Sequence, residues 1–303
     1  MSLSIVILTF NERDNLPRCL ESLEPVGGEL FIVDSGSVDG TLDIAAGHNA
    51  RIFSHPFETH AKQWAWALDN LPLTSEWILA LDADQRLTAE LAAELRDLFA
   101  GRGQNLDSLD GLFLNRRQVW RGRWIRHGTY YPKYLLKLFR RGKAHFDPND
   151  LLDHHFYISG ATANLRHDMI EENKKEDDIT FWINKHNHYS TLKAREERFF
   201  EVNGYHSPLP PSWWGNPDQR TLRLKEFWRK LPLFLRPSFY FLYRYFLRLG
   251  FLDGKEGFIF HFLHAFWFRL LVDIKLEEMR AAAPGPEQPR IIETTPERMK
   301  PNA

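Results

Sequence analysis

Residues 77–88 read WILALDADQRLT, and this stretch decides the fold of the 303-residue chain. Its first residues are apolar and carboxylates follow at once, which is typical of a buried strand that ends at a polar site. Asp82 and Asp84 stand two residues apart, so together they could serve one divalent cation and its diphosphate ligand. Acidic residues are also common in ordinary turns, so this motif alone leaves both interpretations open.

Two apolar stretches upstream, 4–10 and 30–34, also end in polar residues. These residues are Thr9, Asn11, Glu12, Asp34 and Ser35. In an open α/β sheet, ligands bind outside the carboxyl ends of the strands. We therefore expect these groups to meet Asp82 and Asp84 at one edge of a sheet. The sequence SGSVDGT after Asp34 also fits an ordinary turn followed by a helix N-cap.

Strand-like and helix-like segments alternate up to about residue 145, which predicts an α/β unit with a largely parallel sheet. Strands are expected at 4–10, 30–34, 51–54, 77–81, 111–115 and 135–139. Helices are expected at 14–23, 41–46, 60–71 and 87–99, with a loop at 116–134. In the first helix, Leu16, Cys19, Leu20 and Leu23 fall on one face, which predicts that this face is buried.

Composition divides the chain into four parts. Residues 1–206 are expected to form the α/β domain, including a helix at 177–203, and the Pro/Trp/Gly-rich stretch 207–220 is expected to be a linker. Residues 221–280 combine aromatic side chains with many cations, and the Pro- and Glu-rich tail 281–303 is expected to be disordered.

The overall charge and the cysteine count exclude some classes of protein. A formal net charge of -1 argues against a nucleic-acid partner, which would need a broadly basic surface. One cysteine, Cys19, excludes an intramolecular disulfide and fits a reducing compartment. The N-terminus lacks the features of a signal peptide, and no uninterrupted apolar stretch approaches the roughly 20 residues of a spanning helix. We therefore expect a cytoplasmic protein.

Three motifs in this order resemble the family 2 nucleotide-sugar glycosyltransferases. They are IVILTFNERDNLPRCLESL, FIVDSGSVDGT and WILALDADQRLT, at residues 5–23, 31–41 and 77–88. The resemblance implies the nucleotide-binding fold called GT-A, with a mostly parallel central sheet. It also implies a nucleotide-diphosphate sugar donor, an inverting transfer and a Mg or Mn cation.

The resemblance also implies roles for individual residues. Thr9, Asn11 and Glu12 would line the nucleotide pocket, and Asp34, with Ser35 beside it, would hold the base. Asp82 would approach the ribose or the metal, and Asp84 would coordinate the metal. The segment 60–68, HAKQWAWAL, would border the donor through Lys62 and Gln63, although a helix that simply packs explains it equally well.

An inverting transfer needs a general base that deprotonates the acceptor hydroxyl. In similar sequences this base lies in a short acidic segment after a strand with an LFRKG-like ending. Here that segment offers Asp147, Asp150, Asp153, His154 and His155. We take Asp153 as the first candidate and His154 as the second, and either could be a plain turn residue.

Two further segments leave alternatives open. Residues 116–127 carry five arginines and His127, which fits either a solvated loop or a site for acceptor phosphate. Residues 227–276 alternate aromatic and basic side chains, which favours helices lying in a membrane interface. The alternative is a helical hairpin packed on the catalytic domain with 250–257 as its turn. This region also resembles the C-terminal part of bacterial family 2 enzymes that build surface polysaccharide or lipopolysaccharide core.

The sequence therefore predicts a metal-dependent glycosyltransferase, peripheral on the inner face of the cell membrane, with a lipid-linked or other glycan acceptor. A nucleotidyltransferase is the alternative enzyme, but the glycine-rich phosphate loop it usually needs is missing. A dinucleotide oxidoreductase is disfavoured because no GxGxxG follows the first strand. A non-catalytic membrane scaffold with a nucleotide-binding fold is the third hypothesis.

Overall fold

The computed structural model describes residues 1–282, apart from 104, 148–150, 153–154 and 206. Within this part, one sheet runs through the N-terminal half in the order β3-β2-β1-β4-β8-β6-β9-β5, with β7 paired to β6. The strands are β1 (Leu3–Thr9), β2 (Glu29–Asp34), β3 (Arg51–Ser54), β4 (Trp77–Asp82), β5 (Gln85–Leu87), β6 (Gly111–Trp120), β7 (Arg123–Ile125), β8 (Tyr134–Arg140) and β9 (Thr162–Glu171).

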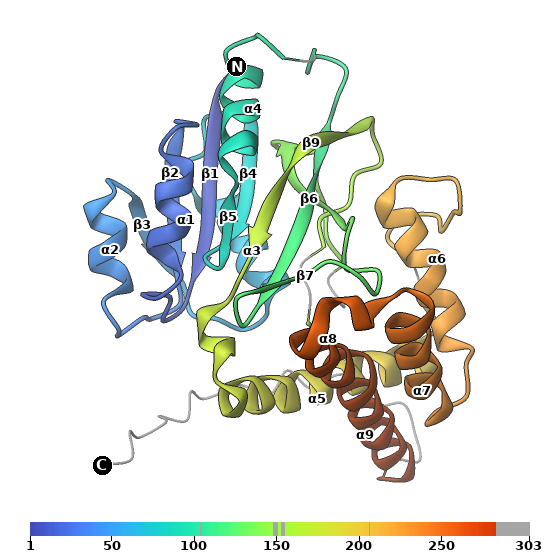
Figure 1. Cartoon of the computed structure of the whole chain (residues 1–303). Helices are drawn as coiled ribbons and strands as arrows, with labels where there is room; N and C mark the ends of the chain where they lie inside the picture. The colour runs from blue at the N-terminus through green and yellow to red at the C-terminus, as the bar shows by residue number, and fades with distance from the viewer. Residues whose placement is uncertain (104, 148–150, 153–154, 206, 283–303) are drawn as a thin grey trace, which may run out of the picture.

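Strand direction brings the ends of most strands to the same edge of the sheet. The pairs β1–β2, β1–β4 and β2–β3 are parallel. Strand β8 runs antiparallel to both β4 and β6, and β9 is parallel to β6. Strands β1, β2, β4, β6 and β9 therefore all end at the lower edge in Figure 1, opposite the N-terminus. We call this the donor edge.

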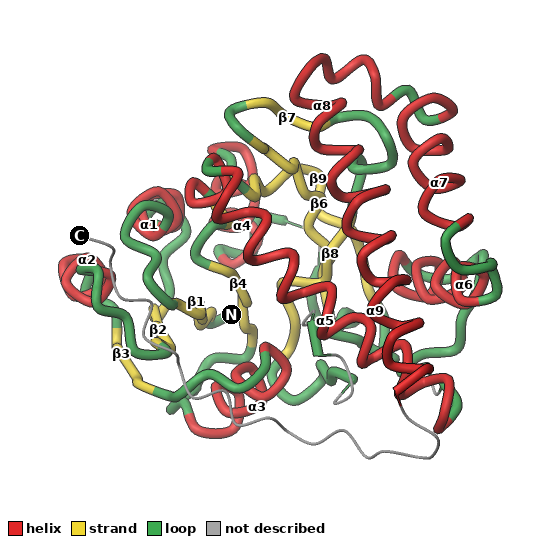
Figure 2. The backbone as a smooth tube through the Cα atoms, turned by 90° about the horizontal axis from the view of Figure 1, so that it is seen from below, coloured by secondary structure: helices red, strands yellow, loops and turns green. Residues whose placement is uncertain are grey.

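Amphipathic helices cover both faces of the sheet. They are α1 (Leu16–Leu23), α2 (Thr41–Gly47), α3 (His60–Asn70) and α4 (Ala89–Phe99). As Figure 2 shows, α1 and α4 lie on one side of β1 and β4, and α3 lies on the other. The predicted apolar face of α1 is buried in the first core. Trp64 of α3 packs in the second core, against Phe113 and Phe156.

The C-terminal half forms a helical lobe beside the donor edge (Figures 1 and 2). Its helices are α5 (Ile179–Asn203), α6 (Pro217–Arg229), α7 (Leu235–Leu242), α8 (Gly254–His261) and α9 (Phe268–Ala282). Short π or 3-10 turns join them: η2 (Tyr243–Leu247), η3 (Gly250–Asp253) and η4 (Phe262–Trp267).

Helices α5 and α9 hold the lobe together. Ala194 of α5 packs against Val272 and Leu276 of α9. Buried Arg236 pairs with Asp273 and with Glu197, the latter at 2.6 Å. A boundary near residue 206 would therefore separate α5 from its packing partners, although the four-part division stays a prediction.

Three local predictions were wrong for physical reasons. The expected loop 116–134 contains the end of β6 and all of β7, because Arg121 and Gly122 adopt positive φ values and turn the chain into a hairpin. Strand β9 was not predicted, because charged residues interrupt the apolar alternation of TANLRHDMIE. Strand β5 has three residues, too few to show periodicity.

Among the described residues, one helical run is apolar and long enough to cross a membrane, Gly250–Ala282. Inside the protein, 44% of its apolar window is buried. Lys275 at its C-terminal part donates to Asn187 and Ser190 of α5 at 2.8 Å. These contacts fit a helix packed on its own chain, and the absence of a spanning segment stays a prediction.

Candidate active site

The loops after β1 and β2 are fastened together at the donor edge. Asn11 adopts φ 54°, a left-handed conformation that asparagine tolerates better than most residues. Its amide donates to Ser37 Oγ at 2.8 Å, and its side-chain oxygen accepts from the Val38 amide at 2.9 Å. The Glu12 amide donates to Thr41 Oγ1 at 2.8 Å. The two predicted nucleotide-binding motifs thus form one surface.

Asp34 is the anchor of this surface. Its buried carboxylate accepts from Thr9 Oγ1 and from the amides of Gly36 and Ser37, each at 2.8 Å. Ser37 Oγ donates to it as well, at 2.5 Å. The bonds shown by the structure all go to the neighbouring loops, so Asp34 shapes the proposed base pocket.

Helix α3 reaches the same surface through Gln63, which is buried. The Gln63 amide donates to Ser35 Oγ at 3.1 Å, and its oxygen lies 2.7 Å from His55 Nδ1. Lys62, by contrast, is half-exposed and pairs with Glu58 one turn earlier. Gln63 is therefore a supporting residue of the β2 loop, and Lys62 is engaged within its own segment.

The two carboxylates after β4 differ in their surroundings. Asp82 Oδ2 lies 3.0 Å from the buried Lys137 ammonium of β8. For Asp84, burial together with the carboxylates of Glu171 and Asp82 raises the pKa well above the usual range, although Lys185 acts against the rise. The next residue, Gln85, ties the turn down by accepting from the Asp82 amide and donating to Glu171.

Glu171 is a site residue that the sequence analysis missed. It ends β9 at the donor edge and pairs with Arg116 at 2.9 Å. The signal was present as a carboxylate after an apolar pair, but the strand before it was not recognised. Without β9, nothing in the sequence placed Glu171 beside Asp84.

Two lysines after β9 bring positive charge to the same edge. Lys175 pairs with Glu12 at 2.5 Å. Lys185 of α5 lies 2.7 Å from Glu176; burial opposes its charged form, but the nearby Glu176 and Asp84 carboxylates hold its pKa above the ordinary value. The first turns of α5 therefore supply a partly buried cation near the acidic turn after β4.

The residues at this edge fit a hard divalent cation. Asp84 and Glu171 supply oxygen donors, and the raised pKa of Asp84 reflects negative charge that a cation would offset. Within the described ranges, no group of three or more His, Cys, Asp or Glu side chains is arranged to hold an ion alone. This agrees with Mg²⁺ sites that use one or two carboxylates and complete the shell with substrate phosphates.

The proposed catalytic base falls mostly outside the described residues. Asp150, Asp153 and His154 lie in the two undescribed gaps. Asp147 is half-buried and lines a small polar crevice against the helical lobe, with Lys225 and Arg229. His155 is half-buried and is followed by Phe156, which packs on Trp64 of α3. Phe156 therefore lies on the α3 face of the sheet.

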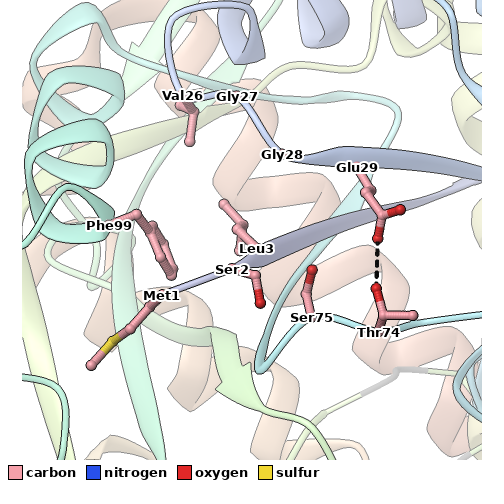
Figure 3. A pocket seen from close by; sticks show the side chains of 10 residues that line it. All are labelled: Met1, Ser2, Leu3, Val26, Gly27, Gly28, Glu29, Thr74, Ser75 and Phe99. Carbon is pink, nitrogen blue, oxygen red and sulfur yellow. Dashed lines mark hydrogen bonds between the residues drawn. The ribbon is translucent and has the colours of Figure 1, made fainter.

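A larger hollow lies at the opposite edge of the sheet. Figure 3 shows it around the start of β1, with Met1, Leu3, Gly28, Glu29 and Phe99 among its lining residues. Glu29 and Thr74 bond across it at 3.3 Å. Since its lining comes from the amino ends of the strands, this hollow is remote from the site described above.

A model of the family described as "Glycosyl transferase family 2" matches residues 4–171. The chain belongs to this family. The match ends where β9 ends, so it contains the whole donor edge and leaves out the helical lobe. The protein is thus a glycosyltransferase with the mixed α/β GT-A architecture and a C-terminal apolar helix.

Two relatives that are themselves named glycosyltransferases agree with this assignment. "Lipopolysaccharide core biosynthesis glycosyltransferase LpsC" of Rhizobium meliloti is 31% identical over 202 residues, 65% of this chain and 72% of that protein. An "Uncharacterized glycosyltransferase" of Rickettsia bellii is 32% identical over 103 residues, 34% of each chain. Among solved structures, S. aureus TarS 1-349 in complex with UDP-GlcNAc has a TM-score of 0.45 at 15% identity, covering 93% of this chain and 92% of that one.

Proposed function

We propose that this protein transfers a sugar, with inversion, from a nucleoside diphosphate sugar to a glycan acceptor and uses Mg²⁺ or Mn²⁺. The observation that carries the proposal is the donor edge. There the fastened loops after β1 and β2 meet the acidic turn after β4, where the carboxylates of Asp82, Asp84 and Glu171 lie close enough together to raise the pKa of Asp84. A cation and a diphosphate would complete this arrangement.

The roles proposed for the chain's own residues follow from these positions. The loops anchored by Asp34 bind the nucleoside, and Gln63 of α3 positions Ser35 by a hydrogen bond to its hydroxyl. Asp84 and Asp82 would hold the cation, which when bound would offset the charge of the diphosphate leaving group. Lys185, partly buried near Asp84, adds positive charge on the side of α5.

Inversion requires the acceptor hydroxyl to attack from the side opposite the leaving diphosphate. A carboxylate or imidazole within hydrogen-bond reach of that hydroxyl would take its proton. Asp153 remains our first candidate and His154 the second. This choice rests on the family resemblance; of the residues that follow them, Phe156 packs on Trp64 of α3.

We further propose that the helical lobe docks on an anionic membrane surface. A band of exposed apolar side chains crosses α7, η2, η3 and α8, and we call it the aromatic face. Its members are Phe239, Leu242, Tyr243, Phe246, Leu247, Leu249, Phe251, Leu252, Phe258 and Phe262. Leu247 is 75% exposed, which a surface meeting only water would not favour.

Cations flank the aromatic face in the way that an interface with anionic lipid requires. Arg248 and Lys255 are exposed beside it and form no ion pair within the described part of the chain. Apolar rings at headgroup depth with cations near lipid phosphates are typical of interfacial helices. Helix α9 of the same region packs on α5, and the membrane role of the aromatic face is our proposal.

The acceptor is proposed to be a lipid-linked glycan of the cell surface. The relative with 31% identity is named for lipopolysaccharide core biosynthesis, and the aromatic face would bring such an acceptor to the donor edge. We place the protein on the cytoplasmic side of the membrane, where nucleotide sugars are made available to it.

A panel of nucleotide sugars tests the proposal. The full chain should hydrolyse or transfer one donor only when Mg²⁺ or Mn²⁺ is present, and the product should have the opposite anomeric configuration. A product with retained configuration contradicts the inverting mechanism. Release of inorganic pyrophosphate from a nucleoside triphosphate would favour the nucleotidyltransferase alternative, and no turnover with the full panel would favour a non-catalytic scaffold.

A further inference from the structure

The β6–β7 hairpin carries a concentration of positive charge that donor binding does not use. Arg116 and Arg117 pair with Glu171 and Asp168. The exposed residues Arg121, Arg123 and Arg126 have no carboxylate partner in the described part of the chain. In a protein of net charge -1, three unpaired guanidinium groups on one hairpin form a local anion-attracting surface.

Two of the arginines share one aromatic side chain. The Arg117 and Arg126 guanidinium carbons lie 4.9 and 5.2 Å from the Trp124 ring centre. Val119 faces Trp124 in the hairpin register, so continuing the ladder by two residues sets Arg126 opposite Arg117. Like charges placed directly opposite each other destabilise a hairpin, unless an anion lies between them or beside them.

Asp168 cancels only one of these two charges. It binds Arg117 Nε at 2.6 Å, and it also accepts from Asn115 at 2.6 Å and Tyr131 at 3.1 Å. Its carboxylate therefore accepts hydrogen bonds from two residues of β6 and from Tyr131 in the loop after β7. Asp168 does not pair with Arg126. It binds Arg117 through Nε, so this contact leaves the terminal nitrogens of Arg117 unused.

Strand alternation places this pair on the same face of the sheet as α3. Phe113 points into the core beneath α3, so Asn115 and Arg117 lie on the same face of β6. Phe156 packs in the same core.

The helical lobe fixes the hairpin in position. His127 binds Asp253 twice, with its amide at 2.9 Å and Nδ1 at 2.7 Å. Arg244 Nε donates to the Gly128 carbonyl at 2.6 Å, and the Gly128 amide donates to the Arg248 carbonyl at 2.9 Å. Because Arg248 borders the aromatic face, the arginine pair is held rigidly between that face and the donor edge.

We infer that Arg126 and Arg117, with Trp124 between them in sequence, form a subsite for a phosphate group on the face of the β6–β7 hairpin that carries both arginines. Guanidinium groups match phosphate oxygens in a bidentate geometry, and the indole provides a flat surface for the attached sugar or lipid stem. The inference rests on the proposed function for its role in the reaction, since the phosphate would belong to the acceptor or to a lipid headgroup beside it.

Binding to the full-length chain tests the subsite, with UDP and Mg²⁺ at saturation to fill the donor site. Glucose 6-phosphate is the soluble probe, glucose its neutral control, and phosphatidylcholine vesicles with or without phosphatidylglycerol the lipid probe. Arg126→Ala should weaken phosphate binding roughly tenfold, and Arg126→Lys should restore part of it. Arg102→Ala, at an exposed arginine near the end of α4, is the matched control and should change nothing.

The two probes distinguish the sources of phosphate. A loss of glucose 6-phosphate binding in Arg126→Ala supports a sugar-phosphate acceptor, and a loss confined to phosphatidylglycerol vesicles supports a headgroup. Equal binding by Arg126→Ala and Arg102→Ala to both probes overturns the subsite. UDP binding is measured separately, so failure of UDP binding with intact Arg126-dependent phosphate binding overturns only the proposed function.

Discussion

The Lys137 ammonium lies 3.0 Å from Asp82 Oδ2, across the antiparallel neighbours β8 and β4. The lysine side chain is 5% exposed and the aspartate side chain 23%. The first carboxylate of the acidic turn, Asp82, is therefore neutralised by Lys137, and we propose that the second, Asp84, binds the cation. This difference between Asp82 and Asp84 could not be read from a motif in which the two look equivalent.

Replacing Lys137 with Met should destabilise the fold and change cation binding. Loss of a partner for a partly buried carboxylate should lower the free energy of unfolding by about 2–3 kcal/mol. Removal of a positive charge beside the site should also tighten Mn²⁺ binding without nucleotide, by roughly tenfold at most. Denaturant titration and calorimetry measure these effects, with Lys143→Met as a surface control. Unchanged stability and unchanged Mn²⁺ affinity would show that the pair has no electrostatic role.

Asp34→Asn should loosen the nucleotide surface. The amide group of asparagine would present a donor where the Gly36 and Ser37 amides now find an acceptor. We expect about 1–3 kcal/mol of lost stability and at least tenfold weaker UDP binding. Ser37→Ala keeps both amide bonds and removes the two bonds of Ser37 Oγ, one to Asp34 and one from the Asn11 amide, so its effect on stability and on UDP binding should be smaller. If Asp34→Asn binds UDP like the unmodified protein, the loop anchoring is not needed for the donor.

The sequence predicted site residues that lie within one short motif, but it did not predict residues that reach the site from distant strands. Motifs with local spacing, such as Asp34 before its glycine loop, were placed correctly at strand ends. Lys137 and Glu171 come from strands 50 or more residues after the motif they meet, as the 55-residue separation of Asp82 and Lys137 shows. Their position depends on the order of strands in the sheet, which periodicity does not encode.

Asp218 should make stability depend on pH. Burial raises the pKa of this carboxyl in the first turn of α6 from 3.8 to about 7, although Lys133 and Lys225 act against the rise. Between those values the folded state binds more protons than the unfolded state, so stability falls as pH rises from about 4 to about 7 and then levels off.

Asp218→Asn should remove that dependence. The variant should be more stable than the parent at about pH 8, by up to about 4 kcal/mol, and similar to it at about pH 4. Thermal unfolding across this range measures the difference, with Asp97→Asn, at an exposed residue of α4, as the control. Parallel curves for the parent and Asp218→Asn would mean that the carboxyl is charged in the folded state throughout.

The aromatic face should bind anionic vesicles in a salt-dependent way. Each Lys or Arg near such a surface contributes about 1 kcal/mol and is screened by salt. We expect the double variant Phe246→Ser/Leu247→Ser to lose most of its sedimentation with phosphatidylglycerol vesicles. The double variant Arg248→Ala/Lys255→Ala should lose part of it. Val38→Ser, at a single exposed apolar residue on the donor edge, is the control.

Full-length variants suit this vesicle test better than truncation. Removing the chain after about residue 217 would strip α9 from α5 and uncover Ala194 together with the buried charges Glu196 and Glu197. If the parent protein fails to sediment at low salt, the aromatic face is a packing or partner surface, and the acceptor has no need of a membrane.

The composition of the C-terminal region indicated amphipathic helices, but the packing of these helices was not predictable. Arg244 is one of many cations in that stretch, yet it is buried over Tyr130 and donates to Gly128, which lies 116 residues earlier. Arg248, four residues later, is exposed. The sequence shows the same residue type at both positions, and only the contact with the β6–β7 hairpin separates them.

UDP binding by Asp84→Asn, measured by calorimetry with and without Mn²⁺, tests the central claim most directly. Asparagine keeps the shape of the side chain but removes the negative charge that would hold a cation against the diphosphate. We predict that Mn²⁺ strengthens UDP binding by the parent and by Asp97→Asn by at least tenfold, and that Asp84→Asn loses this gain together with sugar transfer. Equal Mn²⁺-dependent binding and transfer by Asp84→Asn and the parent would contradict a metal-assisted donor site at this edge of the sheet.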